Sequence, residues 1–131
     1  MTNPTTAPVE TFFQAFAKGD MPALLDTLHP DIILSSDGPS NVPWYGTFHG
    51  HEGAKDMLGR LGSNVTTQAF EIKGIVGEGN LAMATGTLHH QINSTGKPFK
   101  GAWALVCDIQ DGKIKTYRFF EDTAAAGVAF Q

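Results

Sequence analysis

The sequence has little of what several classes of protein require. Its single cysteine, Cys107, cannot form an internal disulfide, and in a strand it is expected to be a small buried side chain rather than a nucleophile. The net charge is −4 and no run of lysines and arginines occurs, which gives no electrostatic support for a nucleic-acid or membrane-surface role. No secretory leader or long apolar run opens the chain. A cytoplasmic protein is therefore expected.

The signatures of metal and nucleotide sites are also weak. His49 and His51 have no obvious third ligand nearby, and His89 and His90 are neighbours in a predicted strand. Neighbouring residues of a strand point to opposite faces, so these two cannot share one ion without a bulge. The glycines around Gly77 lie in a turn with no helix after it, which argues against a phosphate-binding loop. The sequence predicts no metal and no cofactor.

What is present suits one compact domain spanning residues 1–131, because 41% of the residues are hydrophobic and only 17% are charged. Hydrophobic periodicity and turn residues predict two helices at about 9–18 and 20–28, a strand at 31–36, a loop at 37–50, a helix at 51–61, strands at 65–76, 81–92, 99–110 and 113–121, and a short helix after Asp122. Helices followed by a meander indicate an α+β, cone-like fold, with the N-terminal helices packed in a strongly curved antiparallel sheet.

The clearest local signal is Asp111-Gly112, which predicts a two-residue hairpin turn. The turn places Gln110 opposite Lys113 and, by simple alternation, Ala104 opposite Phe119. One face would then hold small residues opposite larger ones, which leaves room for a ligand: Ala102, Ala104, Val106, Tyr117, Phe119 and Glu121. The other face is bulkier and suits a protein contact: Trp103, Leu105, Cys107, Ile109, Ile114, Thr116, Arg118 and Phe120.

Together these segments resemble a SnoaL-like, ketosteroid-isomerase-related domain of the nuclear transport factor 2-like superfamily, whose fold is cystatin-like. The resemblance rests on the order and spacing of Ala17–Asp20, His29–Ile32, Pro43–Gly50, Asp111–Ile114 and Phe119–Thr123. It implies a pocket between the concave sheet and the helices, and a homodimer through the outer sheet face. The family includes isomerases, cyclases, hydrolases, dehydratases and proteins that only bind, so it does not by itself give the function.

The catalytic residues known in such relatives are mostly absent from the corresponding positions of this sequence. The base of the ketosteroid isomerases would fall at Ser36, with Asp37 one step beyond, and their oxyanion donors would fall near Phe12 and Ala104, which cannot donate from a side chain. The aspartate of the limonene-epoxide hydrolases would fall at Phe119. Neither of these two reactions is expected. The alignments imply that Ala104 and Phe119 face the pocket, and a looser alignment adds Thr85, Thr87 and His89, with His90 as the alternative to His89.

Three residues are candidates for acid–base chemistry. Glu121 would face an apolar cavity, where burial raises a carboxyl pKa, unless it is partly solvated or pairs with Lys100 instead. His89 is its expected partner, or else a hydrogen-bonded residue of the pocket wall. Asp37 follows the first strand, where it is also an ordinary turn residue. The expected ligand-binding residues are Phe12, Phe16, Trp44, Tyr45, Thr87, Ala104, Tyr117 and Phe119.

Three functions remain open from the sequence. The first is a cofactor-independent enzyme of isomerase, cyclase or hydratase/lyase type that acts on a small hydrophobic molecule. The second is a binding protein with the same pocket and no turnover. The third is a dimerisation module that uses the outer face of the sheet, with Trp103, Leu105, Arg118 and Phe120 as its contact residues.

Overall fold

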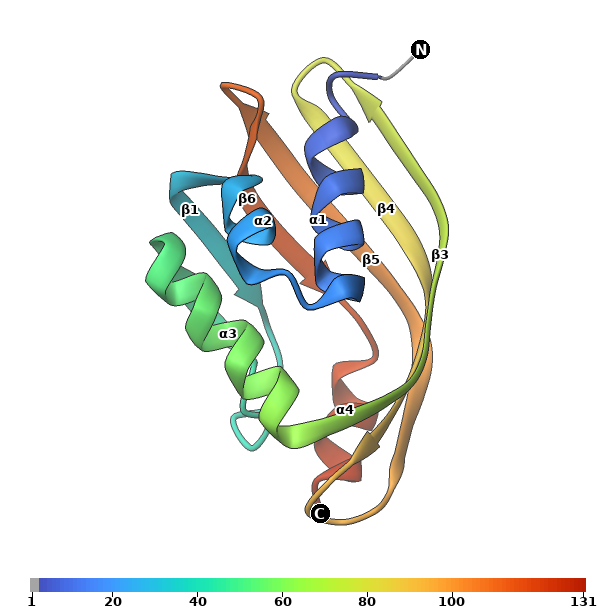
Figure 1. The fold of residues 1–131 in the computed structure, drawn as a ribbon. Coiled ribbons are helices and arrows are strands. Elements are labelled where there is room, and N and C mark those ends of the chain that lie inside the picture. Colours follow the sequence, from blue (N-terminus) through green and yellow to red (C-terminus); the bar gives the residue numbers. More distant parts are fainter. Residues whose placement is uncertain (1–2) are drawn as a thin grey trace.

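The computed structural model describes residues 3–131. The helices are α1 (Ala7–Lys18), α2 (Met21–Asp26), α3 (Gly50–Asn64) and α4 (Thr123–Ala129). The strands are β1 (Leu28–Ser36), β2 (Gly46–His49), β3 (Val65–Glu78), β4 (Leu81–Ile92), β5 (Pro98–Gln110) and β6 (Lys113–Phe120). Figure 1 shows the long strands curving around α1, with α3 on the side of β1.

The strands form one sheet in the order β2-β1-β6-β5-β4-β3. Every neighbouring pair is antiparallel except β1 and β6, which run parallel, so the sheet is mixed. The prediction of an α+β cone with N-terminal helices in a curved sheet is confirmed in its architecture, and the parallel pair is the departure from it. Because β6 pairs with both β1 and β5, its residues lie in the middle of the sheet.

Local signals define most of the helix ends. Gly19 adopts a φ of 67° at the end of α1, and its N–H bonds to the last carbonyls of that helix. The carboxylate of Asp20 accepts the N–H of Ala23 at 3.2 Å and caps α2. Asp122 caps α4 in the same way, through the N–H of Ala125 at 3.0 Å. All three ends are as the sequence predicts.

Two segments differ from the sequence prediction. The second helix ends at Asp26 rather than at His29-Pro30, because Leu28 already pairs with Ile114 of β6. Pro30 lies inside β1, where the β1–β6 register shifts and a missing N–H is tolerated. The expected loop contains the short edge strand β2, which pairs with the end of β1.

The predicted hairpin forms, but its register shifts beyond the turn. Asp111 and Gly112 have φ values of 55° and 71°, as a type I′ turn requires, and Gln110 faces Lys113. Between the pairs Ile109–Ile114 and Asp108–Thr116, β6 contains one extra residue, Lys115. This bulge changes which residues of β5 share a face with Tyr117 and Phe119.

The pairing of β5 predicted by simple alternation is therefore wrong. Phe119 pairs with Leu105, and Ala104 pairs with Phe120 on the outer face. Trp103, only 2% exposed, lies in the core rather than on the outer surface where it was expected, and Leu105 does likewise. On β4 the looser alignment is one residue out of register, since Thr85 pairs with Ala104 and lies on the same outer side of the sheet.

The residues of β4 that face the interior are therefore the alternate set to the one expected. Thr87 is exposed, and His89 lies on the same outer side of the strand, whereas His90 is buried. The expectation that Thr85, Thr87 and His89 face the interior is wrong, and the alternative, His90, is the residue that does. The core thus combines this face of β4 with Trp103 and with Phe12 and Phe13 of α1.

Candidate functional site

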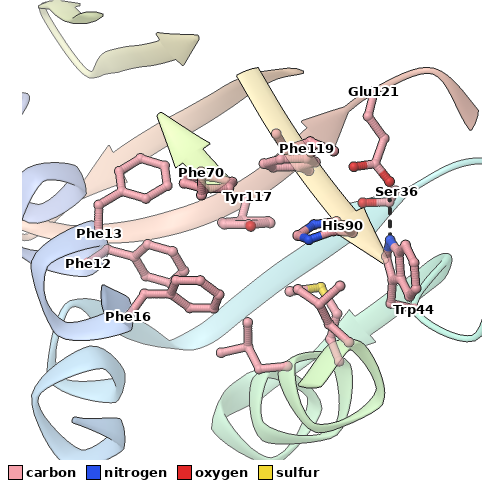
Figure 2. A pocket seen from close by; sticks show the side chains of 14 residues that line it. Phe12, Phe13, Phe16, Ser36, Trp44, Phe70, His90, Tyr117, Phe119 and Glu121 are labelled. Atoms are coloured by element: carbon pink, nitrogen blue, oxygen red, sulfur yellow. Dashed lines mark hydrogen bonds between the residues drawn. The ribbon is translucent and has the colours of Figure 1, made fainter. Parts of the chain in front are cut away.

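A cavity lies between the concave face of the sheet and helices α1 and α3 (Figure 2). It holds about 590 Å³ of space free of protein atoms, part of which opens to solvent. The fourteen lining residues are mostly apolar: Phe12, Phe13, Phe16, Ser36, Trp44, Met57, Leu58, Leu61, Phe70, Leu88, His90, Tyr117, Phe119 and Glu121. A concave, mostly apolar lining with a few polar groups is typical of a site for a small organic molecule.

One wall of the cavity is a row of nearly parallel aromatic rings on the sheet. Phe70 stacks on Trp103 with ring centroids 5.0 Å apart, and Trp103 stacks on Phe119 at 5.5 Å. Phe119 continues the row to Tyr117 at 6.1 Å, and the planes in each pair lie within 18° of one another. Phe12 of α1 contacts Tyr117 from the opposite side at 5.5 Å. The result is an apolar wall of stacked rings.

Glu121 provides the acidic group of the cavity. It follows β6 directly, two residues beyond Phe119, so its side chain continues the inward alternation. Its Oε2 accepts two hydrogen bonds, from the Tyr45 hydroxyl at 2.7 Å and from Trp44 Nε1 at 3.2 Å. Burial raises the pKa of Glu121 above its ordinary value, and these two hydrogen bonds oppose the rise only in part.

The two donors, Trp44 and Tyr45, belong to the loop after β1, and contacts with α4 and the residue after it hold this loop in place. The Tyr45 ring packs so closely on Gly38 that a Cβ at that position would overlap it. The Trp44 ring contacts Phe130 beyond α4, with centroids 5.6 Å apart. Asn41 donates to the carbonyl of Gly127 at 3.0 Å and ties the same loop to α4. Burial, and then the nearby Glu121 carboxylate, raises the pKa of Tyr45, so its hydroxyl stays a donor.

His90 is the second titratable group with access to the cavity. Its Nδ1 lies 3.1 Å from the hydroxyl of Thr67 on β3, which fixes the ring and leaves Nε2 available. Burial, and then the neighbouring His89, lowers the pKa of His90 to about 4. The imidazole is therefore neutral near pH 7. In Figure 2 the ring lies between Tyr117 and the end of the cavity where Ser36 and Glu121 meet.

A model of the SnoaL-like domain matches residues 9–117 of the chain. The chain belongs to the SnoaL-like family. Among curated proteins, none matches this SnoaL-like chain in sequence.

Solved structures agree with this family over the whole chain. An NTF2-like protein from Burkholderia xenovorans is 25% identical, with a TM-score of 0.91, and the match covers 100% of this chain and 98% of that one. An NTF2-like protein of unknown function from Burkholderia pseudomallei is 19% identical, with a TM-score of 0.87 and 99% of both chains covered. TerC, co-crystallised with polyporic acid, is 18% identical, with a TM-score of 0.86 and 98% of both chains covered. At these identities the likeness establishes the fold.

The structure of the SnoaL-like chain gathers many of the residues expected at the site. The expected residues that line the cavity are Phe12, Phe16, Trp44, Tyr117, Phe119 and Glu121. Tyr45 reaches the cavity through its bond to Glu121. The carboxylate has no ion pair with Lys100 among the described residues, so this alternative is not realised.

Four expected residues lie elsewhere. Thr87 and His89 lie on the outer side of β4, and Ala104 lies on the outer side of β5. The bulge in β6 sets which residues of β5 face outward, and the residues of β4 that pair with them face the same way. Asp37 is exposed, because Ser36 before it points inward and the next residue points away. The structure therefore does not bring His89 or Asp37 together with Glu121.

The most important residue that the expected set left out is His90. Its signal in the sequence is the alternation of Leu88, His90 and Ile92, all buried, with polar neighbours between them. The lining residues Met57, Leu58 and Leu61 of α3 were also not among the expected site residues. In residues 3–131 no three His, Cys, Asp or Glu side chains lie close enough together to hold a metal ion, and no helix there is long and apolar enough to span a membrane.

Proposed function

We propose that this SnoaL-like protein is a cofactor-independent enzyme that transfers a proton to or from a small, largely apolar, ring-containing molecule in the cavity. Glu121 is the acid or base, and neutral His90 is its partner. The observation that carries this proposal is a half-buried carboxylate that accepts two hydrogen bonds and has a raised pKa, at the polar end of an aromatic cavity. Such burial tunes a carboxyl group toward the pH range useful for general acid–base catalysis.

The hydrogen bonds of Glu121 favour one atom for the transfer. Oε2 accepts from both Tyr45 and Trp44, which occupies its two lone pairs. The proton of the neutral acid is therefore carried by Oε1, the oxygen that neither donor uses. Two fixed donors on the other oxygen also hold the carboxyl plane, which reduces the reorganisation needed when the proton moves.

His90 supports the same reaction without a positive charge. With Nδ1 engaged by Thr67, Nε2 is the nitrogen that can meet a substrate oxygen. If the Thr67 hydroxyl donates to Nδ1, then Nε2 carries the hydrogen and stabilises a developing oxyanion. Supporting evidence that this fold accommodates an organic molecule comes from TerC, which was co-crystallised with polyporic acid.

Deuterium exchange tests the proposal without knowledge of the natural product. Ring-containing ketones, with and without an amine, are incubated with the protein in D₂O, and exchange at the carbon next to the carbonyl is followed by NMR. We expect acceleration by the wild type and its loss, by about 100-fold or more, in Glu121→Gln. Glu71→Gln, an exposed site on β3, is the matched control. Equal exchange rates with Glu121→Gln and Glu71→Gln would contradict a role of Glu121 in the mechanism.

A binding protein without turnover is the second candidate. The observation in its favour is that Glu121 links the end of β6 to the loop of Trp44 and Tyr45, a structural use that needs no reaction. Native mass spectrometry before and after mild denaturation separates the two candidates when combined with the exchange assay. A retained apolar molecule with no exchange in any ketone would favour binding alone.

We also propose a homodimer through the outer face of the sheet. The corrected register gives this face Met83, Ala104, Val106, Arg118 and Phe120 in place of the buried Trp103 and Leu105. Met83 is 41% exposed and Phe120 is 49% exposed, which is unusual for such large apolar side chains near the middle of a sheet.

A further inference from the structure

The charges around the cavity are unbalanced. Of its fourteen lining residues in the described chain, Glu121 alone carries a carboxylate, and none is a lysine or an arginine. His90 does not compensate for this negative charge, because burial keeps its imidazole neutral near pH 7. Tyr45 and Trp44 stabilise Oε2 as uncharged donors, so the carboxylate has hydrogen bonds but no counter-ion. An ionised group in such a place gains most from a positively charged neighbour.

Aromatic rings line the same space. Phe12 and Phe16 approach from α1, and the row that includes Tyr117 and Phe119 covers the sheet side. The electron-rich faces of aromatic rings attract cations, and the attraction is larger where water is excluded. Aromatic rings and a carboxylate without a counter-ion are the combination that recognises an organic cation. A carboxylate or phosphate ligand would find no positive partner here and would be repelled by Glu121.

From these contacts we infer that the cavity takes a ring-containing molecule with a protonated amine, whose ring stacks on the aromatic wall and whose ammonium group pairs with Oε1 of Glu121. The inference rests on the proposed use of the cavity and narrows its substrate class. In this arrangement Glu121 is ionised and the ammonium donates to one lone pair of Oε1, the oxygen that Tyr45 and Trp44 leave free, so the second lone pair of Oε1 remains for the proton transfer. The hydrocarbon body of the molecule occupies the apolar part of the cavity between α1 and β6 (Figure 2).

Three compounds with the same fused ring and different charges test this inference. Binding of 2-naphthylmethylamine, 2-naphthylmethanol and 2-naphthoate is measured by calorimetry near pH 7 with the full chain. We expect the amine to bind about tenfold more tightly than the alcohol, and the naphthoate to bind least. In Glu121→Gln the advantage of the amine should disappear while the alcohol still binds. Glu71→Gln should behave as the wild type.

Each result has a definite consequence. An alcohol or a naphthoate that binds as tightly as the amine would overturn the inference, and so would an amine preference that persists in Glu121→Gln. The ranking of the three compounds in the wild type is decisive even if that variant does not fold. Binding of none of them would overturn both this inference and the cavity as a ligand site. The deuterium-exchange assay judges the proton-transfer function separately, because it does not depend on the charge preference.

Discussion

Replacement of Glu121 by Gln should change how the stability of the protein depends on pH. Gln has nearly the same volume and keeps an acceptor oxygen for Tyr45 and Trp44, but it cannot ionise. In the folded chain burial raises the pKa of Glu121 above 4.5, its ordinary value, so the folded chain holds this proton more tightly than the unfolded chain. The stability that this group contributes is therefore fully present below pH 4.5 and is lost as the pH rises through the folded-state pKa.

The structure sets the size of the effect. Within that window the free energy of unfolding of the wild type falls, relative to the variant, by up to about 1.4 kcal/mol per pH unit, which corresponds to one proton. The two donors on Oε2 oppose the loss, since a hydrogen bond to a charged group contributes about 1.5–3 kcal/mol. The direction of the pKa shift indicates that burial outweighs them. We therefore expect the stability of the variant to rise relative to that of the wild type as the pH increases from 4.5 through the folded-state pKa of Glu121.

Urea denaturation of both proteins at about one-unit steps from pH 4 to pH 8 measures this difference. His90 acts in the opposite sense: its pKa is lowered to about 4 on folding, so its stabilising contribution is present above pH 6.5 and is lost as the pH falls toward 4. Subtraction of the variant from the wild type removes this contribution, which both proteins share. A difference that stays constant with pH, or one that also occurs in Glu71→Gln, would refute the reasoning.

Three further changes test the site and the surface. Tyr45→Phe removes the shorter hydrogen bond to Glu121 and should raise the pKa of that carboxyl further, which a carbon-detected NMR titration would detect; an unchanged or lower pKa would contradict the role of Tyr45. Gly38→Ala should destabilise the protein by about 1–3 kcal/mol in urea denaturation, because its Cβ overlaps the Tyr45 ring, whereas Gly59→Ala, in open space on α3, should stabilise it by up to about 1 kcal/mol. Phe120→Glu should convert the proposed dimer to a monomer in sedimentation equilibrium, and a monomeric wild type would contradict the interface.

The architecture could be predicted because its signals are local. The C-cap at Gly19, the N-caps at Asp20 and Asp122, and the Asp111-Gly112 turn each depend on a few neighbouring residues. Short-range physics of this kind acts in the same way in any fold. The order of these elements was then enough to indicate helices inside a curved sheet.

The faces of β4 and β5 could not be predicted by the same means. A single unpaired residue in β6, Lys115, shifts the register beyond the turn and inverts the faces that counting from the turn assigns to β5. The bulge has a local partner, because the Thr116 hydroxyl accepts the N–H of Asp108 at 3.0 Å and donates to its carboxylate at 2.7 Å. The alternation of apolar residues along β5 and β6 gives no sign of these two hydrogen bonds. The size of the apolar side chains was a better signal of which face of β5 is buried, because Trp103 and Leu105 are too large and apolar to leave on an exposed face.

The aromatic wall of the cavity depends on this same bulge. With Tyr117, Phe119 and Glu121 facing inward, the extra residue is what places Trp103, rather than Ala104, behind Phe119 and completes the aromatic wall. The groups around Glu121 come from distant parts of the chain, since its two donors follow β1 and His90 belongs to β4. No short sequence motif can contain such a site. Two chains that share every local signal of this fold can therefore differ in the shape of the cavity wall by one inserted residue in β6, because that residue decides whether Trp103 or Ala104 lies on the inner face beside Phe119.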